Sequence, residues 1–172
     1  DDRDLALESL MLALRSGELP FPAEGRIGFL RARVHGDLLK FGDRLVCEQD
    51  FRPAALELEA AGLTGPDHRV LEGKFALVLL LPERQKLLTQ ADLARGMDLL
   101  DVGGILAVSL HNDWGAKRYE KLLAELAGEV ESFSKNHCRV FWARKTADLE
   151  PDLMAEWRSH AESSRIAQGR FW

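Results

Sequence analysis

The sequence predicts an α/β domain in which helices cover both faces of one mostly parallel sheet. Short apolar runs alternate with helical stripes along most of the chain, which is the pattern of such domains. The run Phe75–Leu81 is apolar without a break and stops at Pro82, which favours a strand buried on both faces over a longer buried helix. Two β-type runs around the polar turn Ser134–His137 predict an antiparallel hairpin at the end of the sheet.

The residues before this central strand are predicted to form two helices and two or three strands. Apolar residues at i, i+3, i+4 and i+7 predict a helix over roughly residues 3–16, which Gly17 ends. Pro53 suits the first turn of a second helix. The expected strands are Arg26–Arg33, Leu45–Glu48 and a brief one around Val70–Leu71.

After the central strand the alternation of helix and strand continues. A helix is expected within about residues 86–100, and Gly103-Gly104 are expected to turn the chain into a strand, Ile105–Leu110. A clear apolar stripe from Tyr119 to Leu126 predicts a helix that ends at Gly128, and Pro151 opens the last helix.

Length, charge and cysteine content limit the classes of function. The 172 residues suit one domain with one core, and the formal charge of −5 argues against a general nucleic-acid coat. No apolar run reaches transmembrane length, so no membrane partner is expected. Cys47 and Cys138 form no C-x-x-C pair, which predicts reduced thiols, partly buried in strands, and a cytoplasmic location.

Common catalytic signatures are absent from the sequence. There is no G-x-G-x-x-G, no phosphate-binding G-x-x-x-x-G-K-[ST] and no G-x-S-x-G. The five histidines never fall in H-x-H or H-x-x-x-H spacing, so no metal site is expected.

Four segments in order resemble S-adenosylmethionine-dependent methyltransferases. They are EQDFRPAALELEAAG, FALVLLLP, LLDVGGILAVSLHNDWG and SKNHCRVFWARK. Their order and spacing are most similar to the amino-terminal half of RsmC-like ribosomal RNA guanine-N2 methyltransferases. The resemblance implies a Rossmann-like class I methyltransferase-type three-layer sandwich. In that family a carboxyl-terminal domain binds the cofactor and performs the chemistry, while the amino-terminal domain has lost both.

The cofactor-binding motifs of the family are degraded here. Catalytic members carry a D-x-G-x-G-x-G loop after the first strand, where backbone approaches the cofactor closely. Laying Gly36 on the last glycine puts Ala32 and Val34 at the earlier glycine positions. Asp50 matches the acid that binds the cofactor ribose, and it is either a remnant or a cap between loop and helix. Glu48 would substitute for it in a shifted register.

The catalytic motif of the family is also missing. Active members carry N-P-P-[aromatic] at the exit of the central strand, and the aligned residues here are Leu81-Pro82-Glu83-Arg84. Leucine cannot offer the hydrogen bonds that orient an exocyclic amine. No catalytic residue, no bound metal and no cofactor are therefore predicted in this chain, and S-adenosylmethionine is expected only in the parent enzyme.

Basic residues are expected to gather at the carboxyl edge of the sheet. The candidate RNA contacts are Arg84, Lys86, His111, Lys117 and Arg118. Further cations at the hairpin turn are Lys135, His137 and Arg139. They are either solvated surface charges or phosphate contacts that position RNA without reading its sequence. Trp114 would either stack on a base or pack on its own domain.

Together these features predict a non-catalytic, methyltransferase-like domain over residues 1–148. Residues 149–172 are expected to be a linker helix and a tail, ending in Phe171-Trp172, that lead to a carboxyl-terminal catalytic domain. The expected partners are that domain and ribosomal RNA. Two alternatives stay open: a divergent single-domain methyltransferase that uses Asp50, and a module that binds only another protein.

Overall fold

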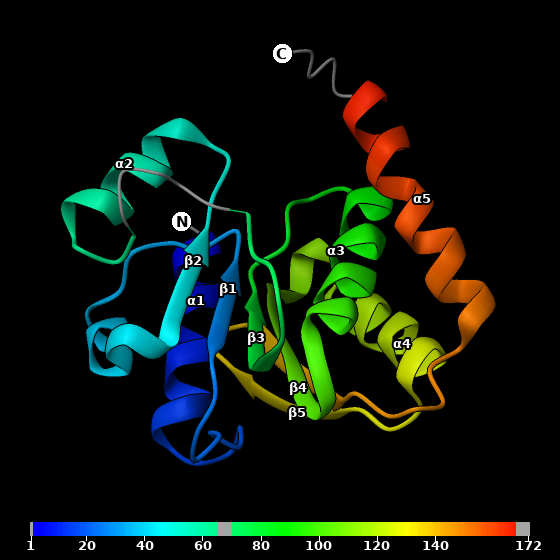
Figure 1. The fold of residues 1–172 in the computed structure, drawn as a ribbon, viewed down its shortest axis with the longest axis horizontal. Coiled ribbons are helices and arrows are strands. Elements are labelled where there is room, and N and C mark those ends of the chain that lie inside the picture. The colour runs from blue at the N-terminus through cyan, green and yellow to red at the C-terminus, as the bar shows by residue number, and fades with distance from the viewer. Residues whose placement is uncertain (1, 65–69, 168–172) are drawn as a thin grey trace.

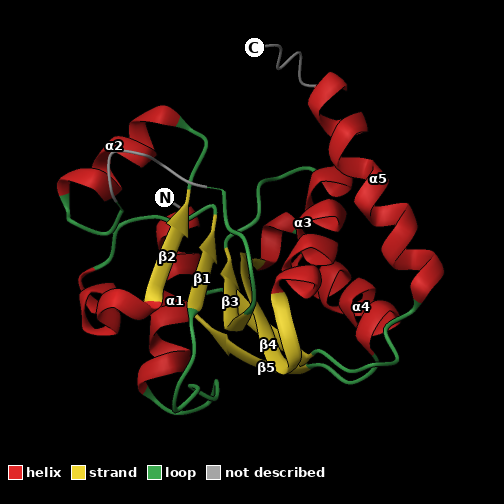
Figure 2. Ribbon diagram, viewed as in Figure 1, coloured by secondary structure: helices red, strands yellow, loops and turns green. Residues whose placement is uncertain are grey.

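The computed structural model describes residues 2–64 and 70–167, which form one six-stranded sheet with helices on both faces (Figures 1 and 2). The spatial order of the strands is β2-β1-β3-β4-β6-β5. Their bounds are β1 Ile27–Leu30, β2 Leu45–Glu48, β3 Phe75–Leu80, β4 Leu100–His111, β5 Glu131–Lys135 and β6 Cys138–Arg144. The α-helices are α1 Asp2–Arg15, α2 Arg52–Ala60, α3 Lys86–Leu99, α4 Ala116–Ala127 and α5 Pro151–Ala167. Two 3₁₀ segments are η1 Gly36–Arg44 and η2 Asn112–Trp114.

The prediction for the central strand is confirmed. Strand β3 lies between β1 and β4 and pairs with both in parallel, and β1 also pairs with β2 in parallel. Strand β6 runs antiparallel to β4 and β5. Asn136 and His137 connect β5 to β6 with positive φ angles of 54° and 60°, the backbone of a tight hairpin turn whose twist matches its strands. The fold is the predicted mostly parallel sheet with an antiparallel hairpin.

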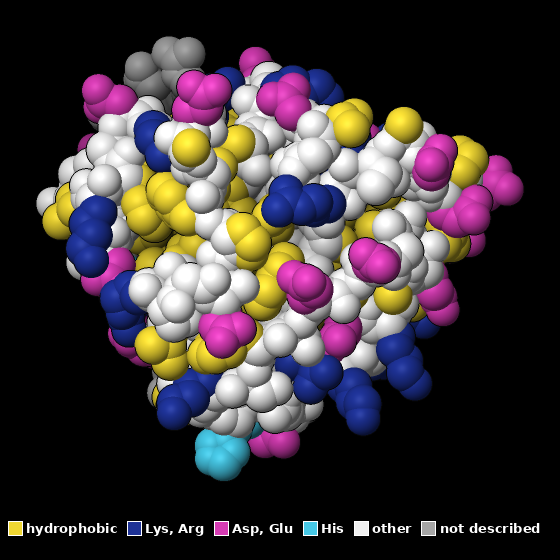
Figure 3. Space-filling view, turned by 90° about the horizontal axis from the view of Figure 1, so that it is seen from below, with side chains coloured by type: hydrophobic (Ala, Val, Ile, Leu, Met, Phe, Trp, Pro, Cys, Tyr) yellow, Lys and Arg dark blue, Asp and Glu magenta, His cyan; other side chains and the backbone are white. Residues whose placement is uncertain are grey.

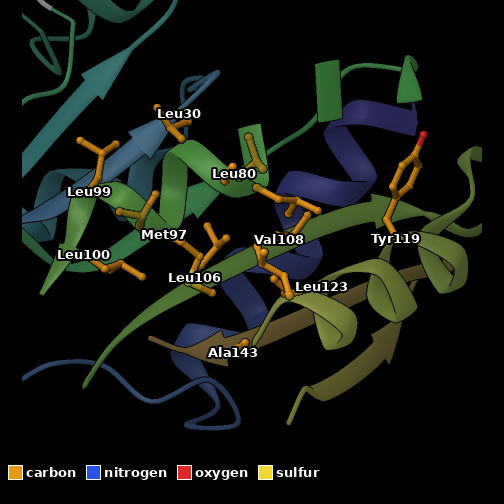
Figure 4. Close-up of a cluster of buried hydrophobic side chains, with 14 of the residues drawn as sticks. Leu30, Leu80, Met97, Leu99, Leu100, Leu106, Val108, Tyr119, Leu123 and Ala143 are labelled. Atoms are coloured by element: carbon orange, nitrogen blue, oxygen red, sulfur yellow. The ribbon is translucent and has the colours of Figure 1, made fainter. Parts of the chain in front are cut away.

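Two apolar layers flank the sheet because alternate strand residues face opposite sides. On one side Ile27, Phe29 and Leu77 pack against α1. On the other side Leu80, Leu106 and Val108 pack against α3 and α4, as the close-up in Figure 4 shows. Every residue of β1 is buried, and the same holds for β3 except for a partly exposed Ala76. The long apolar run of the sequence is therefore explained by burial on both faces.

Two predicted local features are wrong. Gly103 and Gly104 do not turn the chain before a strand but lie inside β4, which begins at Leu100. A Cβ on Gly104 would stand 3.1 Å from the carbonyl oxygen of Ala76, so glycine allows β3 and β4 to approach closely there. The brief strand around Val70–Leu71 is absent; instead the Leu71 N–H donates to Glu48 Oε1 (2.8 Å).

Helix α5 lies along the outer side of α3 (Figure 1). Met154 and Trp157 of α5 are buried in the same apolar cluster as Leu93 and Met97 of α3. Helix α3 is therefore enclosed between the sheet and α5, which explains why most of its residues are buried. The predicted tail beyond α5, with Phe171-Trp172, lies outside the described residues.

Both cysteines are buried in strands, as predicted: Cys47 in β2 and Cys138 in β6. Burial raises the pKa of the Cys47 thiol to about 12, so its reactive thiolate is scarce at neutral pH. No helix among the described residues combines the length and apolarity that a bilayer crossing needs.

Candidate functional site

The carboxyl ends of β1, β2 and β3 meet at one edge of the sheet, which is where ligands of open α/β sheets bind. A small hollow, partly open to solvent, lies at this edge. We call it the carboxyl-edge hollow. It is lined by Arg31, Arg33, Gln49, Phe51, Ala54, Leu81 and Glu83.

The side chain of Arg31 occupies this edge and is held by two carboxylates. Its Nε donates to Asp92 Oδ2 (2.6 Å) and its Nη2 to Asp92 Oδ1 (3.3 Å), while its Nη1 lies 3.8 Å from Asp50 Oδ1. The Arg31 and Asp92 side chains are only 14% and 11% exposed. Burial acts to lower the pKa of the Arg31 guanidinium, but the Asp92 carboxylate, with smaller contributions from Asp50 and Glu83, raises it above the usual value. Arg31 is therefore a fixed positive charge.

The backbone of Arg31 is itself unusual. Its φ angle is 56°, in the left-handed region that costs a non-glycine residue about 1–2 kcal/mol. This conformation turns the chain sharply at the end of β1 and directs the Arg31 side chain toward α3, where Asp92 lies. The ion pair with Asp92 offsets the strained backbone.

The two acids predicted for the ribose-binding position lie in different surroundings. Asp50 is 56% exposed and faces the Arg31 guanidinium. Glu48 forms a two-pronged ion pair with Arg95, with Nη2 donating to Oε1 over 2.6 Å, and it also accepts from the Leu71 N–H. The hydrogen bonds of Glu48 therefore connect β2 to α3 and to the segment before β3.

The loop after β1 is fixed rather than open. The Ala32 N–H donates to the Glu48 carbonyl (3.0 Å), and Gln49 Nε2 donates to the Ala32 carbonyl (2.8 Å), which joins the exits of β1 and β2. Three charge contacts then tie the loop and η1 to α1: Arg33–Asp4, His35–Glu8 and Asp37–Arg15. A Cβ on Gly36 would meet nothing within 4 Å, so no close approach requires glycine there.

The exit of β3 carries an apolar residue where the family pattern has asparagine. Leu81 is 5% exposed, and Pro82 is also buried. The Glu83 carbonyl accepts from the Gln85 N–H (2.9 Å) and from Thr89 Oγ1 (3.2 Å), which starts α3. These contacts build a helix start and leave no polar side chain at the Leu81 position to orient an amine.

The structure brings the predicted basic residues to the same edge, beside the hollow. Arg84 is exposed, and its Cζ lies 4.9 Å from the centroid of the half-buried Trp114 ring. This contact joins the exit of β3 to η2. Lys86 begins α3, and Lys117 and Arg118 lie in the first turn of α4, all three exposed.

The histidine among the predicted RNA contacts has a different role. His111 is 7% exposed, and its Nδ1 accepts from the Asp113 N–H (3.1 Å), so it caps η2. At the hairpin, Arg139 is paired with Glu120, whereas Lys135 and His137 are exposed.

The residues at this edge depart from the S-adenosylmethionine-binding pattern of the family. Side chains stand at Ala32 and Val34, where the family pattern has glycine, and the loop that carries them is tied to α1. Continuing the same alignment puts Leu30, which is 2% exposed, at the acid of the glycine-rich motif.

Sequence reasoning missed the pair Arg31–Asp92. One signal could have found it: Asp92 lies among apolar residues on the buried part of a predicted helix, and a buried carboxylate requires a cation or a hydrogen-bond donor. The sequence did not reveal which cation, because Arg31, Arg33 and Arg95 all lie within reach of that region of the fold.

Comparison with known proteins shows the fold. No protein-family model and no curated protein matches the chain. Among solved structures, the T. thermophilus 16S rRNA N2 G1207 methyltransferase RsmC, in complex with AdoMet and guanosine, has 22% identity and a TM-score of 0.65. The match covers 87% of this chain and 40% of the RsmC chain, so this chain spans less than half of that protein.

Two further methyltransferase structures are similar over most of both chains. The ribosomal protein L11 methylase of Lactobacillus delbrueckii subsp. bulgaricus has 12% identity and a TM-score of 0.60, covering 80% of this chain and 79% of that one. The N-methyltransferase NodS of Bradyrhizobium japonicum WM9 has 15% identity and a TM-score of 0.56, covering 84% and 96%. The chain thus has the Rossmann-like fold of S-adenosylmethionine-dependent methyltransferases.

Proposed function

We propose that this chain is a non-catalytic, methyltransferase-like domain of a ribosomal RNA guanine-N2 methyltransferase. It supports a separate catalytic domain and helps to hold the RNA. The observation that carries the proposal is Arg31, which fills the carboxyl edge with a buried ion pair to Asp92 where a cofactor-binding domain needs an open loop. The likeness to RsmC, of which this chain matches 40%, supports the same assignment.

The domain contributes a surface rather than a reaction. Arg84 lies in the loop after β3, Lys86 begins α3, and Lys117 and Arg118 lie in the first turn of α4. Cations placed in this way contact phosphates and position RNA without reading its sequence. Figure 3 shows the end of the domain at the amino ends of the parallel strands, where basic and acidic side chains are interspersed.

The first test concerns the cofactor. Titration of S-adenosylmethionine into the chain, followed by calorimetry up to millimolar ligand, is expected to give no saturable heat. A dissociation constant in the micromolar range, about −8 kcal/mol, would contradict the proposal and favour the divergent single-domain enzyme. In that case Asp50→Ala should weaken binding, because Asp50 would then be the ribose ligand.

The second test concerns RNA. We expect the chain to bind single-stranded RNA at low salt, and the combined change of Arg84, Lys86, Lys117 and Arg118 to alanine to abolish most of that binding. Each lost phosphate contact should flatten the slope of log K against log salt by about 0.7. Fluorescence anisotropy measured over a salt series gives both quantities.

The matched control removes four exposed cations elsewhere. They are Lys40, Lys74, Arg144 and Arg158. This variant has the same net charge as the first, so equal losses in both would indicate a non-specific charge effect. If the wild-type protein bound no RNA at low salt, that result would contradict the RNA-holding role. It would favour the alternative of a module that binds only another protein.

A further inference from the structure

We infer that Arg84, whose guanidinium lies over the Trp114 ring, is a stacking platform for one unpaired nucleobase, and that the surrounding cations bind the phosphates beside that base. This inference rests on the proposed function, because it names the part of the RNA that the basic edge takes. It predicts a preference for single strands over duplexes.

The guanidinium of Arg84 is a planar group packed over an indole. The Arg84 Cζ lies over the Trp114 ring at 4.9 Å from its centroid, within the range of a cation–π contact. Trp114 in turn packs on the apolar cluster formed by α3, α4 and the sheet. Because the indole is anchored and Arg84 is exposed, the second face of the guanidinium is available to a flat ligand. Guanidinium planes are established stacking partners for splayed bases.

Many arginines of the described residues are used in ion pairs. Six of them pair with carboxylates: Arg15, Arg31, Arg33, Arg95, Arg139 and Arg158. Among the side chains described for residues 4–64 and 70–162, no carboxylate forms a salt bridge with Arg84, Lys86, Lys117 or Arg118. The charge of these four residues is therefore not used to stabilise the fold through carboxylates.

The positions of three of these cations are also unfavourable for the helices that carry them. Lys86 is the first residue of α3, and Lys117 and Arg118 are the second and third of α4; neither helix has an acidic residue in its first turn. The amino end of a helix is the positive end of its dipole, so cations there are destabilising in the absence of an anion. Neither helix has a side-chain cap. An external anion bound at this edge would offset the cations at the helix amino ends and would accept hydrogen bonds from the uncapped N–H groups.

The planar Arg84 guanidinium and the neighbouring lysines together indicate which ligand class this edge binds. A phosphate alone would be bound by the lysines and would not require Arg84 to lie on an indole. A run of acidic peptide side chains would supply carboxylates for the lysines but no flat ring for Arg84. A nucleotide strand supplies a flat base for Arg84 and phosphates for the lysines, and single-strand sites combine these two elements.

The experiment separates stacking from charge. Fluorescein-labelled single-stranded RNA of mixed sequence is titrated with the chain, and the same oligonucleotide with central abasic residues serves as a probe that keeps every phosphate. Arg84→Lys and Trp114→Leu both keep the net charge. Each is expected to weaken binding of the intact strand about 5- to 100-fold, with the salt slope unchanged. Binding of the abasic strand is expected to be weak already and to be insensitive to Arg84→Lys.

Two matched controls complete the series. Lys86→Arg exchanges a neighbouring cation conservatively and should leave affinity within about twofold, because a phosphate contact needs charge and not a plane. Lys117→Ala should weaken binding and flatten the salt slope by about 0.7. Arg84 is exposed, so Arg84→Lys remains informative even where Trp114→Leu disturbs folding.

The outcomes distinguish this inference from the proposed function. Absence of RNA binding by the wild-type chain at low salt would overturn both. Binding that depends on Lys86, Lys117 and Arg118, but is equal for Arg84→Lys or for the abasic strand, would overturn the stacking platform and leave the RNA-holding role. Equal affinity for a duplex of the same sequence would also overturn it.

Discussion

Replacing Arg31 by alanine is expected to destabilise the domain by about 3–5 kcal/mol, because it leaves the Asp92 carboxylate buried without its partner. For a domain of this size the melting temperature should fall by roughly 6–20 °C. Chemical and thermal unfolding followed by circular dichroism measure both quantities.

The loss should depend on pH in a defined direction. Burial is the largest influence on Asp92 and raises the pKa of its carboxyl above the ordinary value of 3.8, while Arg31 acts to lower it. Without Arg31 this pKa rises further. A carboxyl whose pKa is raised by folding favours the native state below its unfolded pKa and loses that contribution as pH rises through the folded pKa. The defect of Arg31→Ala should therefore be largest at neutral pH and shrink toward pH 4.

Two companion variants separate the ion pair from the backbone. Arg31→Gly removes the same charge but relieves the left-handed φ of 56°, so it should be about 1 kcal/mol less destabilising than alanine. The double change Arg31→Met with Asp92→Leu replaces the buried pair by apolar side chains and should recover most of the stability. An alanine variant as stable as wild type would show that Arg31 does not hold this edge closed.

Replacing Trp157 by alanine is expected to cost about 3–5 kcal/mol, because its side chain is 1% exposed and fills the space between α5 and α3. Because α3 is buried on both sides, loss of this contact should destabilise the whole domain. A single cooperative transition at lower denaturant concentration is the expected result.

The control for Trp157 is a change on the outer side of the same helix. Arg158 forms an ion pair with Asp98 in which both side chains are about half exposed, so Arg158→Ala should cost no more than about 1 kcal/mol. If Trp157→Ala released α5 to proteolysis while the rest of the domain kept its stability, α5 would behave as a separate connector.

The fold could be predicted because its elements carry strong local signals. The apolar run of β3 is unbroken because that strand is buried on both faces. The apolar residues of α4 form a stripe because that helix is buried on one face. The start of β4 was missed because a glycine pair usually indicates a turn, whereas Gly104 permits close contact with the carbonyl of Ala76. That requirement depends on a neighbouring strand about 28 residues earlier in the chain and has no local signature.

The candidate site could be predicted less completely. The lost glycines and the missing asparagine are visible in the sequence, and so are the cations that follow β3 and β4. The ion pair between Arg31 and Asp92 joins residues 61 positions apart, so no spacing rule reveals it. The contact between Arg84 and Trp114 likewise depends on two loops that meet only in the folded sheet.

The enclosure of α3 also has a consequence for biosynthesis. Trp157, which covers α3, follows Met97 by about 60 residues, so at ~5–20 residues per second it is synthesised roughly 3–12 seconds later. During that interval the side of α3 that α5 covers has no cover from that helix. A nascent chain paused before α5 therefore exposes the surface that chaperones of apolar segments bind, and the arrival of the last helix ends that exposure.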